Sequence, residues 1–244
     1  MPIDYPNLEL LHEESFQSLD NWHHEGAGEL ELLEGGGMRM ACLGSQQGAP
    51  GCMAFFRPDL PDAVSIAYDV EVKSHGGLII NYLAIRGMQG EDLIEDAHKL
   101  EPRDGSMRNY YATKWGLQSY HVSYSRFGDD GTHTETSNWK RNPGCLLVGH
   151  GIDLVQELHR TYRLRLTKDA GCLQLFVDGQ FAHGFIDRDS SRHPIPDWGK
   201  FGIRLIGSDV SAEFRNLSVH RIGQQEAIRR DLSDEVEFRP LRRQ

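Results

Sequence analysis

The feature that most constrains this chain is a strict alternation of apolar and polar side chains over residues 64–73, VSIAYDVEVK. The apolar members occupy every second position: Val64, Ile66, Tyr68, Val70 and Val72. Successive side chains of a β-strand point to opposite faces. A period of two over ten residues therefore predicts a strand with one buried face and one solvated face.

Similar strand signals recur elsewhere in the chain. The alternation returns at 161–167 and again within 172–186. The second of these segments contains Asp178-Gly179, a pair suited to a type I′ turn because glycine tolerates positive φ, so we expect a hairpin there. Residues 28–42 are predicted to form two strands around a glycine turn.

The last two predicted strands are 200–206 and 210–221. In the second, the apolar positions change parity near Arg215-Asn216, which predicts a β-bulge. Helical patterning is scarce, and only 91–100 suggests a short helix or turn within a loop. Many short strands separated by turn signals predict an all-β fold, a two-sheet antiparallel β-sandwich.

Length and charge restrict the classes of protein and partner. The chain has 244 residues with 39% apolar content, enough for one core, so we expect a single domain over 1–222 and a charged tail or short helix over 223–244. The formal charge of −10 disfavours nucleic acid, which needs clustered Lys and Arg. No apolar run reaches the roughly 18 residues of a membrane span. The start, MPIDYPNLELLHEESF, has no secretory pattern, which predicts a cytoplasmic protein.

The cysteines do not suggest a metal centre. Four of them, Cys42, Cys52, Cys145 and Cys172, are far apart and form no CxxC pair. Zinc sites use closely spaced thiolates, so we expect small, buried, unpaired residues instead. No cofactor is expected. A structural calcium ion held by loop oxygens is left open, with no ligands assigned.

Residues 74–160 differ from the rest because polar and aromatic side chains concentrate there. Sugar sites need this mixture, since amides and guanidinium groups bind hydroxyls while aromatic rings cover the apolar faces of pyranoses. We therefore expect a groove lined from residue 81 to residue 142. Its predicted substrate-binding residues are Asn81, Asp92, Arg103, Tyr110, Arg126, Asn138, Lys140, Arg141 and Asn142, although Asp92 is equally suited to closing a turn.

The segment 120–126, YHVSYSR, supplies the candidate catalytic residues. In a regular strand His121 would lie on one face and Tyr124 on the other. If Tyr120, Val122 and Tyr124 form the core face, His121 lies in the groove. A bulge would instead bring His121 and Tyr124 to the same side.

The segment 138–144, NWKRNPG, has two amides and two cations within five residues. Asn142 precedes Pro143 and is biased to extended geometry, and Pro-Gly is a turn signal. This combination is suited to clamping an anion or a uronate.

Several of these segments together resemble a known family. GEDLIED (90–96), Arg103-x-Gly105, YHVSYSR and NWKRNPG are similar to stretches of the YesU-like proteins. These are bacterial concanavalin A-like jelly rolls associated with plant-polysaccharide utilisation, and their function is not defined. The resemblance covers most of residues 50–220. It implies a jelly-roll fold and a carbohydrate ligand, and it contributes little to mechanism.

The residue types favour one chemistry over another. Retaining glycosidases of this fold carry an ExDxxE strand, and that pattern is absent, although carboxylates from separate strands could still form a hydrolase site. Polysaccharide lyases neutralise a uronate carboxylate, and a His or Tyr then removes the proton at C5. We therefore expect His121 and Tyr124 as base and acid.

Three functions remain open from the sequence. The favoured one is an enzyme that binds and cleaves an acidic, uronate-containing oligosaccharide. The alternatives are a non-catalytic carbohydrate-binding sandwich and a structural sandwich without a ligand. The expected partner is an oligosaccharide, with no nucleic acid and no membrane, and a homodimer is left open.

Overall fold

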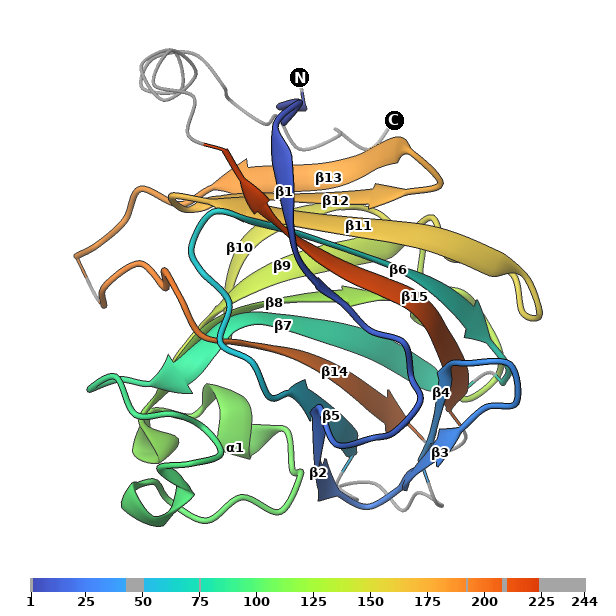
Figure 1. The fold of residues 1–244 in the computed structure, drawn as a ribbon, viewed down its shortest axis with the longest axis horizontal. Helices are drawn as coiled ribbons and strands as arrows, with labels where there is room; N and C mark the ends of the chain where they lie inside the picture. The colour runs from blue at the N-terminus through green and yellow to red at the C-terminus, as the bar shows by residue number, and fades with distance from the viewer. Residues whose placement is uncertain (1, 43–50, 75, 192, 208–209, 224–244) are drawn as a thin grey trace.

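Two antiparallel sheets packed face to face make up the protein (Figure 1). The computed structural model describes residues 2–42, 51–74, 76–191, 193–207 and 210–223. The predicted tail beyond residue 223 lies outside the described residues. The all-β, two-sheet sandwich expected from the alternation is confirmed.

The first sheet, called sheet A here, has eight strands. Their order is β13 (Gln180–Ile186), β12 (Cys172–Val177), β11 (Thr161–Asp169), β6 (Val64–Val72), β15 (Ser211–Ile222), β4 (Met38–Ala41) and β3 (Glu29–Leu32), and β1 (Leu8–Glu13) also pairs with β15. The predicted hairpin at 172–186 and the strand pair within 28–42 are both present. The predicted bulge is present too, because the β15–β6 register shifts between Arg215 and Ser218.

The second sheet, called sheet B, has seven strands. Their order is β10 (Leu146–Ile152), β9 (Thr136–Asn142), β8 (Leu117–Tyr124), β7 (Gly77–Gly87), β14 (Lys200–Gly207), β5 (Cys52–Phe56) and β2 (Trp22–Gly26). The inner faces of both sheets form the main core, in which Tyr68 and Phe214 of sheet A face Phe201 of sheet B. Every second residue of each strand therefore points into the sandwich.

A second, smaller core lies on the outer face of sheet B. The connection between β7 and β8, residues 88–116, folds back over β5, β14 and β7 and is called the cover segment here (Figure 1). It contains the one-turn elements η1 (Ala97–Lys99), α1 (Arg108–Tyr111) and η2 (Thr113–Trp115). Its Leu93 and Tyr110 pack against apolar side chains of sheet B such as Phe55 and Tyr82. The cover segment thus closes one half of the outer face, while β9 and β10 extend beyond it.

The cysteines are all free, as expected. Cys52 and Cys172 are buried, whereas Cys42 and Cys145 are half-buried, so only two of the four fit the expected burial. No helix in the described part of the chain is long and apolar enough to cross a membrane.

Candidate functional site

The two faces of β8 have opposite chemistry. Tyr120, Val122 and Tyr124 point into the main core. The alternate residues Ser119, His121 and Ser123 point to the outer face of sheet B, where the ring of His121 lies 5.1 Å from that of Tyr82. β8 has no bulge within 120–124, so the arrangement that separates His121 from Tyr124 is the one the protein adopts.

Strand β9 divides in the same way. Trp139 points into the core, and the alternate residues Asn138, Lys140 and Asn142 point outward. The register pairs Lys140 with His121 and Asn142 with Ser119, and it also pairs Asn138 with Ser123. Six polar side chains from two strands therefore form one contiguous group on the outer face of sheet B, called the polar surface here: Ser119, His121, Ser123, Asn138, Lys140 and Asn142. Asn138 and Lys140 are half-buried, and the other four are buried.

Hydrogen bonds order the inner end of the polar surface. Asn142 Nδ2 donates to Ser119 Oγ at 2.8 Å and lies 2.9 Å from His121 Nδ1. An amide nitrogen only donates, so His121 Nδ1 accepts and the neutral ring carries its proton on Nε2. Burial, together with the charges of Lys140 and Arg204, lowers the pKa of His121 to about 3. His121 is therefore a neutral donor, and Asn142 Oδ1 is a buried acceptor that has no hydrogen-bond partner among the residues the structure describes.

Lys140 extends the polar surface toward solvent. It is half-buried, and its ammonium donates to Cys145 Sγ at 3.5 Å. No carboxylate of a described residue lies within ion-pair distance of it. A cation in this state is available to an anionic ligand.

Sequence reasoning missed Arg204, which lies on the outer face of β14 beneath the cover segment. Its side chain is completely buried, and its guanidinium lies 5.3 Å from the ring of Tyr110. The signal was present in the alternation of 200–206, where Phe201, Ile203 and Leu205 take the core positions. Arg204 must then point to the opposite face.

Two predicted residues fasten the cover segment to sheet B. Arg103 makes a forked ion pair with Glu25 of β2, with an Nη2–Oε1 distance of 2.6 Å, and Tyr110 donates to Glu25 Oε2 at 2.8 Å. Although burial opposes ionisation, hydrogen bonds from His23, Arg103 and Tyr110 lower the pKa of Glu25 to about 2. Arg103 and Tyr110 therefore both use their polar groups to bind Glu25, and not to line an open groove.

Asp92 is a second attachment of the cover segment. It makes an ion pair with the buried Lys200 of β14 at 2.7 Å, and its Oδ1 accepts from the backbone of Ile94 and Glu95. Burial opposes ionisation of Asp92, but hydrogen bonds from Lys200 and the backbone lower its pKa. The turn-closing interpretation of Asp92 is the one its contacts support.

The expected role of Tyr124 needs correction. Tyr124 and Asn81 both lie between the sheets, where Tyr68 donates to Asn81 Oδ1 at 2.5 Å and its oxygen lies 2.8 Å from that of Tyr124. Neither side chain is exposed, and burial raises the pKa of Tyr124. They face the core because strand parity places them there, so neither joins His121 on the outer face.

Arg141 also needs correction, because it points inward from β9. It bonds Asp187 Oδ2 at 2.8 Å and donates to the carbonyls of Asp189, His193 and Pro194. The segment NWKRNPG is a strand up to Asn142, so its neighbouring residues alternate in direction instead of converging in one loop. Arg126 lies beyond the end of β8, where it bonds Thr136. Of the expected clamp, Asn138, Lys140 and Asn142 lie together.

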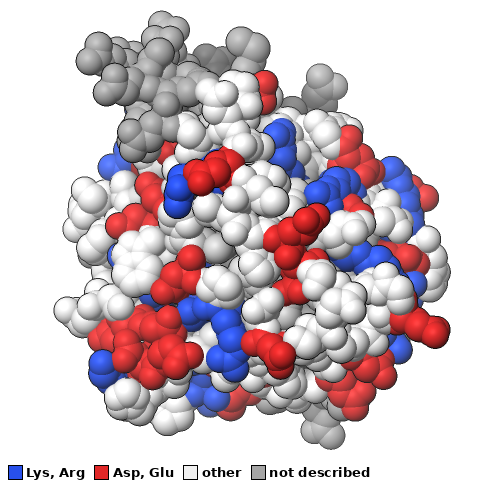
Figure 2. All heavy atoms as spheres, in the orientation of Figure 1, with Lys and Arg blue, Asp and Glu red and all other residues white. Residues whose placement is uncertain are grey.

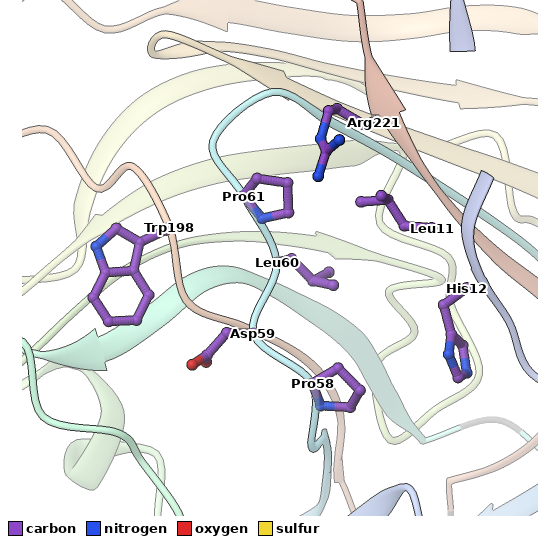
Figure 3. Close-up of a pocket in the computed structure, with 8 residues that line it drawn as sticks. All are labelled: Leu11, His12, Pro58, Asp59, Leu60, Pro61, Trp198 and Arg221. Carbon is purple, nitrogen blue, oxygen red and sulfur yellow. The ribbon is translucent and has the colours of Figure 1, made fainter. Parts of the chain in front are cut away.

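A separate hollow lies away from these residues. It has a volume of about 410 Å³ and is lined around the 58–61 loop by Leu11, His12, Pro58, Asp59, Leu60, Pro61, Trp198 and Arg221 (Figure 3). None of the residues predicted from the sequence lines it, and its side chains are spread around an open surface. We therefore place the candidate site on the outer face of sheet B.

The strands of sheet B are poor in acid groups. Glu25 is the one carboxylate within its seven strands, which also contain five Lys or Arg residues. A retaining hydrolase needs two carboxylates about 5 Å apart, and these strands do not provide that pair. Across the described residues, no group of three or more His, Cys, Asp or Glu side chains is placed to hold a metal ion.

Comparisons with known proteins agree with the fold. The chain is 24% identical over 212 residues to the uncharacterized protein YesU of Bacillus subtilis strain 168, which covers 85% of this chain and 92% of YesU. It is similar to a solved B. subtilis protein of unknown function with a galectin-like fold, with a TM-score of 0.77 and 23% identity over 89% of this chain and 98% of that one. It is also similar to the carbohydrate binding module CBM66 from B. subtilis, with a TM-score of 0.52 and 10% identity over 82% and 94% of the two chains.

The resemblance to YesU-like proteins is thereby confirmed, together with the jelly-roll fold. The model of a domain of unknown function, DUF1961, matches residues 9–219, a range that includes strands of both sheets and the whole polar surface. The chain belongs to the DUF1961 family.

Proposed function

We propose that this protein binds an acidic oligosaccharide on the outer face of sheet B, along β8, β9 and β10. The observation that carries the proposal is the polar surface, at whose half-buried edge the ammonium of Lys140 has no carboxylate partner among the described residues. The carbohydrate binding module CBM66 shares the two-sheet fold and supports a sugar as the class of ligand.

The groups of the polar surface match the chemistry of a uronate. Lys140, which is half-buried, is a cation for a carboxylate. His121 Nε2–H is a donor and Asn142 Oδ1 an acceptor without a partner among the described residues, but both are buried, so the ligand reaches them only when the side chains above them move. Asn138 adds an amide beside Lys140, and Leu147, 60% exposed and paired with Lys140 from β10, adds an apolar contact. Hydroxyls, a carboxylate and an apolar sugar face would each find a partner there.

The proposal is binding, because the lyase pair expected from the sequence is not assembled. His121 Nδ1 is occupied by Asn142, and Tyr124 lies on the other side of the sheet. A general base must be within hydrogen-bond reach of the proton that it removes. Cleavage therefore becomes an outcome of the test: absorbance of an unsaturated product would show that the protein is a lyase.

The test is calorimetry with a panel of uronate-containing and neutral oligosaccharides, with the ultraviolet absorbance followed in parallel. Lys140→Gln should weaken binding of the acidic ligand about tenfold, because it removes a charge-assisted hydrogen bond. The control is Arg39→Gln, which removes one exposed cation from sheet A and should leave binding unchanged. If no oligosaccharide binds the wild-type protein, the proposal is wrong.

A further inference from the structure

Arg204 combines complete burial with nitrogens that have no hydrogen-bond partner among the described residues. The side chain has no exposed surface, and none of its three nitrogens, Nε, Nη1 and Nη2, is hydrogen-bonded within that part of the chain. A guanidinium has five N–H donors and stays charged in proteins. Burying such a group without a partner lowers the stability of the fold, since each ion loses several kcal/mol of hydration free energy. Burial of Arg204 therefore does not stabilise the fold, and its presence at this position needs another explanation.

The surroundings of Arg204 provide only partial compensation. The ring of Tyr110 lies 5.3 Å away, which gives a cation–π contact worth about 0.5–2 kcal/mol. Glu25 occupies the same row of sheet B, because Glu25 pairs with Met53 and Met53 pairs with Arg204. That carboxylate is already committed to Arg103 and Tyr110. The two pairing neighbours of Arg204, Met53 and Ile80, are apolar.

The space around the guanidinium is kept by a glycine. A Cβ added at Gly51 would lie 2.9 Å from Arg204 Nη2, so a side chain there would displace the guanidinium. The nearby rings of Tyr82 and Tyr110 and the side chain of Phe55 form an aromatic wall beneath the cover segment. A cation beside an aromatic wall suits a ligand that combines a carboxylate with an apolar face.

We propose that Arg204 is the carboxylate-binding residue of a second subsite, between β14 and the cover segment, for a uronate of the acidic ligand. Two parallel N–H···O bonds from the guanidinium fork would pair with the carboxylate. Because Arg204 has no exposed surface, the ligand reaches it when the cover segment separates from β14. The sugar part of this inference rests on the proposed function, whereas the anion part does not.

The test compares ligands and variants that differ in one group. Oligomers of galacturonate and of glucuronate are each compared with their methyl esters, which have the same sugar but no charge. Arg204→Met removes the charge at similar length, Arg204→Lys keeps the charge without the fork, and Arg39→Gln is the control on sheet A. Binding is followed by calorimetry, and thermal unfolding is measured in parallel.

We expect the wild type and Arg39→Gln to bind the acid about a hundredfold more tightly than the ester, with about tenfold from each of Lys140 and Arg204. Arg204→Met should keep only the tenfold part that comes from Lys140, and Arg204→Lys should show an intermediate preference. Arg204→Met should unfold at a temperature no lower than the wild type, because an unpaired buried charge is gone. Equal binding of acid and ester by the wild type would overturn the inference. A preference for the acid over the ester as large as that of the wild type in Arg204→Met would also overturn the inference. If Arg204→Met does not fold, the same result in Arg204→Lys would overturn it.

The two proposals fail separately. If neither acid nor ester oligomers bind, the proposed function is wrong, and sodium galacturonate then tests Arg204 alone. A rise in the unfolding temperature of the wild type that is smaller in Arg204→Lys would support an anion site at Arg204. The same rise in both proteins, or no rise, would overturn it.

Discussion

The outer faces of the two sheets differ in how their charges are balanced. On sheet A most charges are paired: Lys73 contacts Glu71 and Glu213, and Arg163 contacts Asp69. Arg165 of β11 is an exception, because it makes a cation–π contact with Phe176 and no ion pair among the described residues. Acidic and basic side chains also lie next to one another over much of the face shown in Figure 2. On sheet B, neither Arg204 nor Lys140 has a carboxylate partner among the described residues. A chain with a formal charge of −10 thus leaves two cations without carboxylate partners on one sheet.

The candidate site differs from the outer face of sheet A in how its cations are paired, more than in how many charges it contains. Exposed ion pairs such as those of sheet A contribute little to stability, about 0–1 kcal/mol each. Cations without carboxylate partners on sheet B reduce stability or add nothing to it, and they are the groups that we propose for binding an anionic ligand. Three further predictions test whether the residues of sheet B that point inward serve stability and those that point outward serve binding.

The largest expected effect comes from neighbouring residues of β9 that point in opposite directions. Arg141→Ala should lower the free energy of unfolding by about 3–5 kcal/mol, because Asp187 would keep a buried charge without its cation. Lys140→Ala, one residue away and half-buried, should change it by about 0.5 kcal/mol or less. Urea denaturation measures both. Equal effects would contradict the alternation of β9.

The second expected effect is a dependence of stability on pH through His121. The pKa of His121 is about 3 in the folded protein and near 6.5 in the unfolded chain. The unfolded state therefore binds the extra proton as the pH falls below 6.5, and stability decreases down to about pH 3. One such histidine contributes a slope of about 1.4 kcal/mol per pH unit over the middle of this range.

His183 provides the matched control, because burial lowers its pKa to about 3 as well. Urea denaturation at pH 7, 6, 5 and 4 should show a smaller slope for His121→Gln and for His183→Gln. Only His121→Gln should weaken oligosaccharide binding, since the hydrogen bond from His183 to Ser137 lies on the inner side of sheet B. An unchanged slope in His121→Gln would show that His121 is not held neutral.

The smallest expected effect comes from Tyr124. Tyr124→Phe removes one hydroxyl from the buried group with Tyr68 and Asn81 and should cost about 1 kcal/mol. Oligosaccharide binding should not change, because the ring stays in the core. Loss of binding in a variant that is otherwise folded would show that Tyr124 reaches the ligand.

Local strand and turn patterns predicted the strands of sheet A other than β1 and, in sheet B, β14. The period of two at 64–73 and the change of parity near Arg215 both appear in the structure as expected, because side-chain direction in a strand follows from backbone geometry. The same rule, applied to 200–206, places Arg204 opposite the core. Applied to 138–142, it separates Arg141 from Lys140, but the Pro-Gly signal suggested a loop there.

Other features depended on contacts between distant segments. The cover segment folds over β5 and β14, which lie far from it in the sequence, and its attachments to Glu25 and Lys200 join residues from three separate regions. Asn81 faces the core although it is polar, because Tyr68 from the other sheet supplies a hydrogen-bond partner. No local pattern contains such pairings.

The sequence by itself determined the all-β sandwich, its strand alternation and a polar central region, because each depends on the period of side chains along one strand. Only the tertiary structure decided which polar residues share a surface. Strand register brings His121, Lys140 and Asn142 together, and the cover segment encloses Arg204. Charge balance is a property of neighbours in space. The two unbalanced cations of sheet B could therefore be identified only after the chain was folded.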